Sequence, residues 1–215
     1  MSAPDRHDES RKYYDTFASG YEKQRHHGYH QWLDDRTIGL LKPLATGKKV
    51  LEVGAGTGLL LRGVAEFADE AVGMDLSHGM LEKAQQRGLT VVEGSATELP
   101  FADASFDLVY SFKVLAHVPD IEGTLREITR VTKPGGRMVL EFYNKRSLRH
   151  MIRRLRPSLT VGPGTDESQV YTRFHNQDEL EAMLPNNVRL ADVSGFRVAT
   201  VLPQIFKVPG VGGVW

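Results

Sequence analysis

The most constraining feature of this chain is a short apolar strand pattern that runs directly into a glycine-rich loop. The strand pattern covers residues 50–53, and three glycines follow at alternate positions, Gly54, Gly56 and Gly58. A helix pattern begins immediately afterwards. A loop whose backbone lies against a ligand has no room for side chains, and the first turn of a helix offers unpaired N–H groups. The segment therefore predicts a strand–loop–helix unit that binds a nucleoside-containing cofactor.

The spacing of the glycines narrows the kind of cofactor. The dinucleotide fingerprint needs its third glycine three residues after the second, and that position here is Leu59. The third glycine is Gly58 instead, and the acidic Glu52 precedes the loop. This spacing argues against a nicotinamide-dependent oxidoreductase, which stays as the less favoured alternative. A tight turn without any ligand is the other interpretation of a lone glycine loop.

Further strand patterns alternate with helix patterns, and this alternation predicts a mostly parallel, doubly wound α/β sheet. The predicted strands are 50–53, 72–75, 90–93, 106–111 and 138–142. Ser77 is expected to cap the helix after the second strand, which Gly88 ends. A turn over residues 133–136 is expected to lead into the fifth strand.

Ligands in such a sheet bind beyond the carboxyl ends of the strands, where Glu52, Asp75, Gly94 and Ser111 are all expected. Asp75 ends the second strand, where an acidic side chain can accept hydrogen bonds from both hydroxyls of a ribose. Leu76 and Met80 follow, and we expect them to pack on an adenine ring.

Several later motifs resemble those of a known family. They are Gly94-Ser95-Ala96 followed by Leu99-Pro100-Phe101, then Ser105-Phe106-Asp107-Leu108-Val109, then Leu115-Ala116-His117-Val118-Pro119-Asp120, and finally Lys133-Pro134-Gly135-Gly136. Together with the glycine loop, their order resembles class I S-adenosylmethionine-dependent methyltransferases of the ubiquinone/menaquinone-biosynthesis type. The resemblance covers roughly residues 10 to 143. It implies a Rossmann-like sheet of about six or seven strands with helices on both faces and an N-terminal helical cap. A methyltransferase acting on a small molecule is the implied function, and a non-catalytic protein that binds the same cofactor is the alternative.

The resemblance also implies the cofactor-binding residues. Tyr21, in the N-terminal cap, is expected to contact the carboxylate of the methionine part of S-adenosylmethionine. Ser95 stands where the family usually has an aspartate that accepts from the adenine amino group, so a hydroxyl replaces a charged acceptor here. The expected set is Tyr21, Glu52, Gly54, Ala55, Gly56, Gly58, Asp75, Leu76, Met80, Gly94, Ser95, Ala96, Ser111 and Phe112.

Fewer residues point to the methyl acceptor and to catalysis. His117 follows the fourth strand, and an imidazole is suited to act as a base near neutral pH, although packing or holding the cofactor is the alternative role. The resemblance implies that the insertion after the fifth strand builds the acceptor pocket, with Tyr171, Arg173 and His175 as its acceptor-binding residues. Tyr14, from the cap, is expected to border the same pocket.

Composition excludes several classes of partner. Lys plus Arg and Asp plus Glu both number 27 in 215 residues, so no net positive field favours nucleic acid. Cysteine is absent, and the histidines at 26, 27 and 30 are expected in a solvated loop, so no metal site is predicted. No apolar run reaches the length of a membrane span. We expect a cytoplasmic monomer or homodimer acting on a small acceptor that is anionic or lipid-like.

Three segments are expected: a cap over 1–43, a core over 44–215, and within the core a lid or acceptor-binding insertion over 145–184. The basic segment 145–156 is expected to form a lid helix, with an anionic surface or substrate as the alternative to a solvated face. Asn176 and Glu179 form a capping pair for a short helix. Residues 187–202 are expected to form one strand, or a hairpin broken at Gly195, unless the final strand of the fold is missing.

Overall fold

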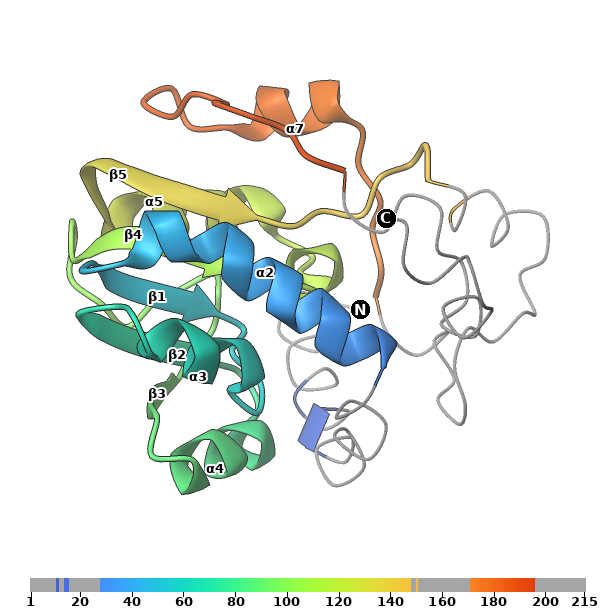
Figure 1. The fold of residues 1–215 in the computed structure, drawn as a ribbon. Helices are drawn as coiled ribbons and strands as arrows, with labels where there is room; N and C mark the ends of the chain where they lie inside the picture. Colours follow the sequence, from blue (N-terminus) through green and yellow to red (C-terminus); the bar gives the residue numbers. More distant parts are fainter. Residues whose placement is uncertain (1–10, 12–13, 16–27, 148–149, 151–170, 196–215) are drawn as a thin grey trace.

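The computed structural model describes residues 11, 14–15, 28–147, 150 and 171–195. Its centre is a sheet of five parallel strands in the order β3-β2-β1-β4-β5 (Figure 1). The strands are β1 (Lys49–Val53), β2 (Glu70–Asp75), β3 (Thr90–Glu93), β4 (Phe106–Ser111) and β5 (Thr132–Leu140). The strand order reverses direction between β1 and β4, and in open sheets of this kind the crevice for a ligand lies at that reversal.

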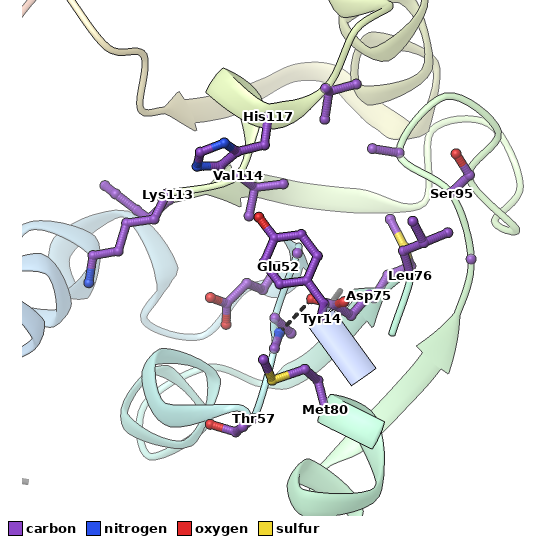
Figure 2. A pocket seen from close by; sticks show the side chains of 18 of the residues that line it. Tyr14, Glu52, Thr57, Asp75, Leu76, Met80, Ser95, Lys113, Val114 and His117 are labelled. Carbon is purple, nitrogen blue, oxygen red and sulfur yellow. Dashed lines mark hydrogen bonds between the residues drawn. The ribbon is translucent and has the colours of Figure 1, made fainter. Parts of the chain in front are cut away.

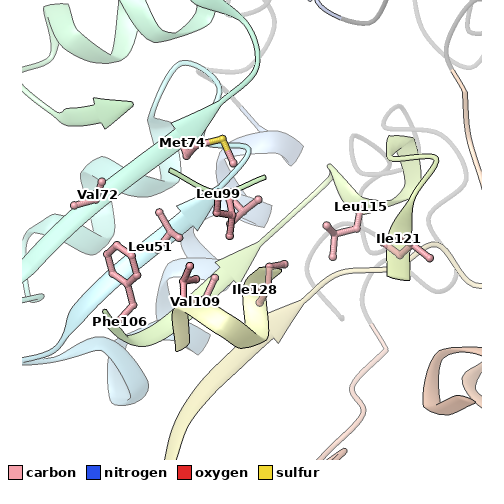
Figure 3. Close-up of a cluster of buried hydrophobic side chains, with 11 residues drawn as sticks. Leu51, Val72, Met74, Leu99, Phe106, Val109, Leu115, Ile121 and Ile128 are labelled. Carbon is pink, nitrogen blue, oxygen red and sulfur yellow. The ribbon is translucent and has the colours of Figure 1, made fainter. Parts of the chain in front are cut away.

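Helices cover both faces of the sheet (Figure 1). They are α2 (Tyr29–Ala45), α3 (Leu59–Ala65), α4 (His78–Gln86), the 3-10 turn η1 (Leu115–His117), α5 (Ile121–Val131) and α7 (Gln177–Met183). Alternate residues of one strand enter different cores, as the pleat of a β-strand requires. Val50 packs with α2 and α3 residues such as Leu41 and Val64, whereas Leu51 packs with α5 residues such as Ile128 (Figure 3).

The predicted parallel, doubly wound fold is confirmed. Five strands lie within the described residues, rather than the six or seven expected. Residues 187–195 form no strand, and residues 196–202 of the predicted final strand or hairpin lie outside the described residues.

The expected turn over 133–136 was wrong. Strand β5 already begins at Thr132 and continues through this segment. Gly135 adopts a left-handed φ of 76°, and the pairing with β4 shifts register between Phe106 and Leu108. Residues 133–136 of β5 stand opposite the single residue Asp107 of β4, so the glycines produce a long bulge within the strand instead of a turn before it.

The two expected helix signals around α4 and α7 are confirmed. The Ser77 hydroxyl accepts a hydrogen bond from the Met80 N–H at the start of α4, and Gly88 follows the helix with a left-handed φ of 76°. Asn176 and Glu179 form a reciprocal capping box at α7. No helix among the described residues is long and apolar enough to cross a membrane. The division into cap, core and insertion stays a prediction.

Candidate functional site

A pocket opens at the carboxyl ends of β1, β2 and β4, where the strand order reverses (Figure 2). Its walls come from the glycine loop, the start of α4, the loop after β3 and the segment after β4. The lining residues are Tyr14, Glu52, Gly54, Ala55, Gly56, Thr57, Leu59, Leu60, Met74, Asp75, Leu76, Met80, Gly94, Ser95, Ala96, Phe112, Lys113, Val114, His117, Val118 and Pro119.

The glycine loop folds tightly over the end of β2. The backbone N–H groups of Gly54 and Ala55 both donate to the Met74 carbonyl, at 2.7 and 2.9 Å. A Cβ atom on Gly54 would lie 2.2 Å from Cγ2 of Val114, whereas a Cβ on Gly56 would meet nothing within 4 Å. Gly54 is therefore required by the protein's own packing, and Gly56 faces open space in which a ligand can approach the backbone.

Asp75 is fixed at one end of the pocket by backbone donors. Its Oδ2 accepts from the Gly56 N–H at 2.7 Å, and its Oδ1 accepts from the Ser77 N–H at 2.9 Å. Burial raises the pKa of this carboxyl above its ordinary value. Each carboxylate oxygen can accept more than one hydrogen bond, so the oriented group can also accept from a ligand hydroxyl.

Glu52 provides a second carboxyl group, deeper in the sheet. Its residue is 3% exposed, and its Oε2 accepts from the Tyr110 hydroxyl at 3.3 Å. Burial raises the pKa of Glu52 to about 8. The negative charge of Asp75 acts in the same direction, and the Lys113 ammonium opposes it. Glu52 is therefore mostly protonated at neutral pH unless a cation approaches it.

The wall around Leu76 and Met80 is held in place by the N-terminal segment. Tyr14 lines the pocket, and its neighbour Asp15 accepts through Oδ1 from the Ser77 hydroxyl at 2.6 Å and from the Gly79 N–H at 3.1 Å. The negative charge of Asp15 stabilises the N-terminus of α4, where the helix dipole is positive. The contact brings Tyr14 over the apolar wall of the pocket.

Ser95 lies in the loop after β3, at the same end of the pocket as Leu76 (Figure 2). Its hydroxyl is engaged locally, 2.8 Å from the Thr97 hydroxyl and accepting from the Thr97 N–H at 3.3 Å. The hydroxyl that replaces the family's aspartate is thus also part of a small turn.

His117 lies within η1, on the wall that the segment after β4 forms (Figure 2). Its Nδ1 is 2.9 Å from the carbonyl oxygen of Tyr171. A carbonyl only accepts, so Nδ1 donates this bond and, in the neutral ring, Nε2 carries the lone pair. The segment that holds His117 is itself anchored, because the Arg173 N–H donates to the Ala116 carbonyl at 2.8 Å.

Thirteen of the predicted site residues line the pocket: Tyr14, Glu52, Gly54, Ala55, Gly56, Asp75, Leu76, Met80, Gly94, Ser95, Ala96, Phe112 and His117. Gly58 begins α3 in a left-handed conformation, and the buried Ser111 donates its hydroxyl to the Val53 carbonyl at 2.7 Å; both support the loop from behind.

The structure places the predicted acceptor-binding residues in different surroundings. Tyr171 and Arg173 lie on the segment that contacts η1, as described above. His175 packs against Phe142, with ring centroids 5.8 Å apart, and is 2% exposed. Tyr21, the histidines at 26 and 27, and most of the basic segment 145–156 lie outside the described residues.

Two lining residues with polar side chains were missed from the sequence. Thr57 lies between two predicted glycines, and its buried hydroxyl has no hydrogen-bond partner in the structure. Lys113 follows β4 with a left-handed φ of 63°. The position of Thr57 inside the glycine loop was an available signal, whereas Lys113 carried none. No cluster of three or more potential metal-ligating side chains occurs among residues that the structure describes.

Comparison with known proteins finds a family model that matches the central segment of the chain. Residues 51–140 match the model of a family described as a methyltransferase domain. A demethylmenaquinone methyltransferase of Corynebacterium efficiens is 44% identical over 103 residues, which are 47% of this chain and 44% of that protein. A 27-O-demethylrifamycin SV methyltransferase of Amycolatopsis mediterranei is 35% identical over 155 residues, covering 60% of this chain and 56% of that protein.

The fold is also found among solved structures. A crystal structure of an S-adenosylmethionine-dependent methyltransferase from Thermotoga maritima gives a TM-score of 0.64 at 24% identity, covering 80% of this chain and 77% of that chain. This likeness concerns the fold alone. The chain spans about half the length of the curated relatives it matches.

Proposed function

We propose that this chain, whose residues 51–140 match a methyltransferase-domain family, is a class I S-adenosylmethionine-dependent methyltransferase that transfers a methyl group from S-adenosylmethionine to a small-molecule acceptor. The observation that carries the proposal is Asp75, whose carboxylate is oriented by Gly56 and Ser77 at the end of β2. It lies beside a glycine loop whose middle residue faces open space.

The residues present fit this cofactor. The proposed binding set is the predicted one, in which Asp75 accepts from the ribose hydroxyls and Leu76 and Met80 pack on the adenine. Ser95 and the backbone of Ala96 border the adenine edge. The buried, unpartnered hydroxyl of Thr57 adds a polar atom at the glycine loop. When bound, the cofactor supplies a methyl group activated by a positively charged sulfur.

Positioning is the main task left to the protein. The glycine loop and the α4 wall hold the adenosine portion of the ligand and so fix where its reactive end lies, and Tyr14 covers the pocket from the cap side. Holding two reactants in line can supply about 7–11 kcal/mol of the barrier. The lining includes apolar side chains such as Val114, Val118 and Pro119, which exclude water from the reacting atoms.

The acceptor is proposed to enter on the side of His117. Where the acceptor must lose a proton, His117 is the proposed base, with its Nδ1 fixed by the Tyr171 carbonyl. Tyr14, Tyr171 and Arg173 remain the proposed acceptor-binding residues, whereas the burial of His175 gives it a packing role instead. The curated relatives are named for demethylmenaquinone and 27-O-demethylrifamycin SV. We therefore propose that the acceptor of this chain is likewise a small organic molecule.

The first test is calorimetric titration of the purified protein with S-adenosylhomocysteine, with NAD as the control ligand. We expect one-to-one binding of S-adenosylhomocysteine and none of NAD. Asp75→Asn should weaken the binding by about 100-fold, because charge-assisted hydrogen bonds to two hydroxyls are lost. The matched control, Asp69→Asn, changes an exposed carboxylate just before β2 and should bind like the natural protein.

Transfer itself is tested with radiolabelled S-adenosylmethionine and a panel of quinols, phenols, alcohols and amines. Label appearing in an acceptor, and lost in Asp75→Asn, supports the proposal. A folded protein that binds NAD but not S-adenosylhomocysteine would overturn it. Tight binding with no product on any acceptor would favour the non-catalytic alternative.

A further inference from the structure

Lys113 lies across the pocket from the residues that we propose to bind the adenosine part of the cofactor. Its side chain brings a positive charge to that end of the pocket. Figure 2 shows Leu76 and Ser95 at one side of the pocket and Lys113 at the other. Among the described residues that line the pocket, Lys113 is the one whose side chain is permanently positive. Nothing in the sequence motifs accounts for a cation there.

The backbone of Lys113 is held in an unusual conformation. Its φ of 63° is left-handed, a conformation that residues other than glycine and asparagine rarely adopt. Its N–H donates to Oε2 of Glu141 at 2.8 Å. The conformation fixes where the side chain leaves the strand end, so the ammonium group is directed along the wall towards α2.

The ammonium group of Lys113 is paired with a carboxylate of the protein. Its Nζ lies 3.1 Å from Oδ1 of Asp34 on α2, and the two side chains are only 22% and 11% exposed. A lysine has a flexible four-carbon stem and a compact charge. It can therefore move between Asp34 and a second carboxylate that arrives close by.

Glu52 lines the same part of the pocket and becomes negatively charged when a cation approaches it, because an opposite charge nearby favours ionisation. Its carboxyl group is close enough to respond to the charges of both Lys113 and Asp34. One acidic and one basic group in one buried corner match a zwitterion, because each ligand charge finds an opposite partner instead of an unpaired buried site. The amino-acid portion of S-adenosylmethionine is such a zwitterion.

We propose that Lys113 is a specificity-determining residue that binds the carboxylate of the amino-acid portion of the cofactor, while Glu52 faces its ammonium group. The inference rests on the proposed function. It assigns to Asp34 the role of holding Lys113 near the pocket when no cofactor is bound.

The test compares two ligands that share the adenosine and the thioether, of which only one carries the amino-acid portion. S-Adenosylhomocysteine carries the amino-acid group, and 5′-methylthioadenosine has the same adenosine and thioether without it. In Lys113→Met, the affinity for S-adenosylhomocysteine should fall by about tenfold or more, and that for 5′-methylthioadenosine should stay within about twofold of the natural value. Lys113→Arg, which keeps the charge, should retain most of the affinity.

The partner of the ion pair provides the sharpest control. Asp34→Asn breaks the same pair, so a purely structural pair predicts the same loss as Lys113→Met, for both ligands. Our proposal predicts the opposite, namely affinity for S-adenosylhomocysteine that is unchanged or tighter, because Asp34 no longer competes for the ammonium. Lys48→Met, at an exposed lysine just before β1, controls for the loss of a positive charge.

Three results would overturn the inference. In the first, Lys113→Met binds S-adenosylhomocysteine as tightly as the natural protein. In the second, Lys113→Met weakens both ligands equally. In the third, Asp34→Asn loses as much affinity as Lys113→Met. Failure of the natural protein to bind S-adenosylhomocysteine at all would instead reject the proposed function, and this inference with it. Retained binding of 5′-methylthioadenosine also reports that each variant has a folded pocket.

Discussion

At the scale of single residues, Glu52 combines an ionisable carboxyl group with nearly complete burial. Its carboxyl group is buried at the end of β1, with the Tyr110 hydroxyl as its hydrogen-bond donor. Burying an ionised carboxylate without a cation is costly, so the protein keeps the group protonated near neutral pH. A cationic ligand reverses this preference, because an opposite charge nearby favours ionisation.

This environment makes a prediction about stability. The pKa of Glu52 is raised from 4.5 to about 8 in the fold, so between these values the folded state binds a proton that the unfolded state has lost. The contribution of Glu52 to stability is therefore complete below pH 4.5 and declines as the pH rises to 8. Glu52→Gln keeps the shape of the side chain but cannot titrate. As the pH rises from 4.5 to 8, the free energy of unfolding of this variant should therefore increase relative to that of the natural protein, by roughly 3–5 kcal/mol.

Urea unfolding at pH 5, 6.5 and 8 measures this difference. Glu98→Gln, at an exposed position in the loop after β3, should show no such trend. A constant difference between Glu52→Gln and the natural protein at all three pH values would contradict the assignment.

The sequence was informative about residues whose type is dictated by backbone geometry or by a strand end. Gly54 is required because Val114 occupies the space of any side chain, and Asp75 is the last residue of a recognisable strand. Lys113 could not be predicted in this way, since its role depends on Asp34, which is 79 residues away in the chain. No local pattern encodes such a pair.

At the scale of elements, the best predictions concerned helices with a local capping signal. Ser77 and Asn176 cap α4 and α7 through hydrogen bonds to residues three positions ahead, which sequence spacing can reveal. The start of β5 was misplaced because Gly135 and Gly136 look like a turn in isolation. Pairing with β4 on either side, at Thr132 and from Arg137 onward, makes them a bulge within a strand, and that pairing is a tertiary contact.

The element η1 carries the second prediction, because it holds His117 against a distant segment. The Nδ1–Tyr171 bond links His117 to residues of the predicted insertion 145–184. His117→Ala removes both this bond and any base, whereas the amide of His117→Asn can still donate to the carbonyl but cannot take a proton. For an acceptor that must be deprotonated, both variants should lower kcat by about 10²–10⁴-fold with little change in S-adenosylhomocysteine affinity.

Turnover with an acceptor from the panel, measured across pH, separates the two roles. Loss of the acidic limb of the pH–rate profile in both variants supports the base. Recovery of turnover in His117→Asn alone would show that His117 only positions the Tyr171 segment, and full turnover in both would remove it from the mechanism.

At the scale of the whole molecule, the order of the strands brings the site together. Glu52, Asp75 and the residues after Ser111 are distant in sequence, yet parallel pairing of β1 with β2 and β4 aligns their carboxyl ends. The segment 171–176 then docks on the chain that follows β5, because His175 forms an isolated parallel bridge with Asn144. The sequence located the first of these assemblies through its repeated strand and helix patterns, but it gave no signal for the second.

This docked segment buries a titratable group, which leads to the last prediction. His175 is 2% exposed, and neither ring nitrogen has a hydrogen-bond partner. Burial lowers the pKa of His175 below 6.5, and the charge of Arg173 acts in the same direction. Lys145 also lowers the pKa, and Glu179 opposes the shift. The folded state therefore resists a proton that the unfolded state accepts.

Stability should consequently fall as the pH decreases below 6.5, by at most about 1.4 kcal/mol per pH unit for one proton. His175→Leu, which fills the apolar site without a titratable ring, should lose less stability between pH 7 and pH 5 than the natural protein. Thermal unfolding at pH 7, 6 and 5 provides the comparison. An unchanged slope in His175→Leu would mean that the docked segment opens before His175 is protonated, and the burial of this segment would then not limit stability in acid.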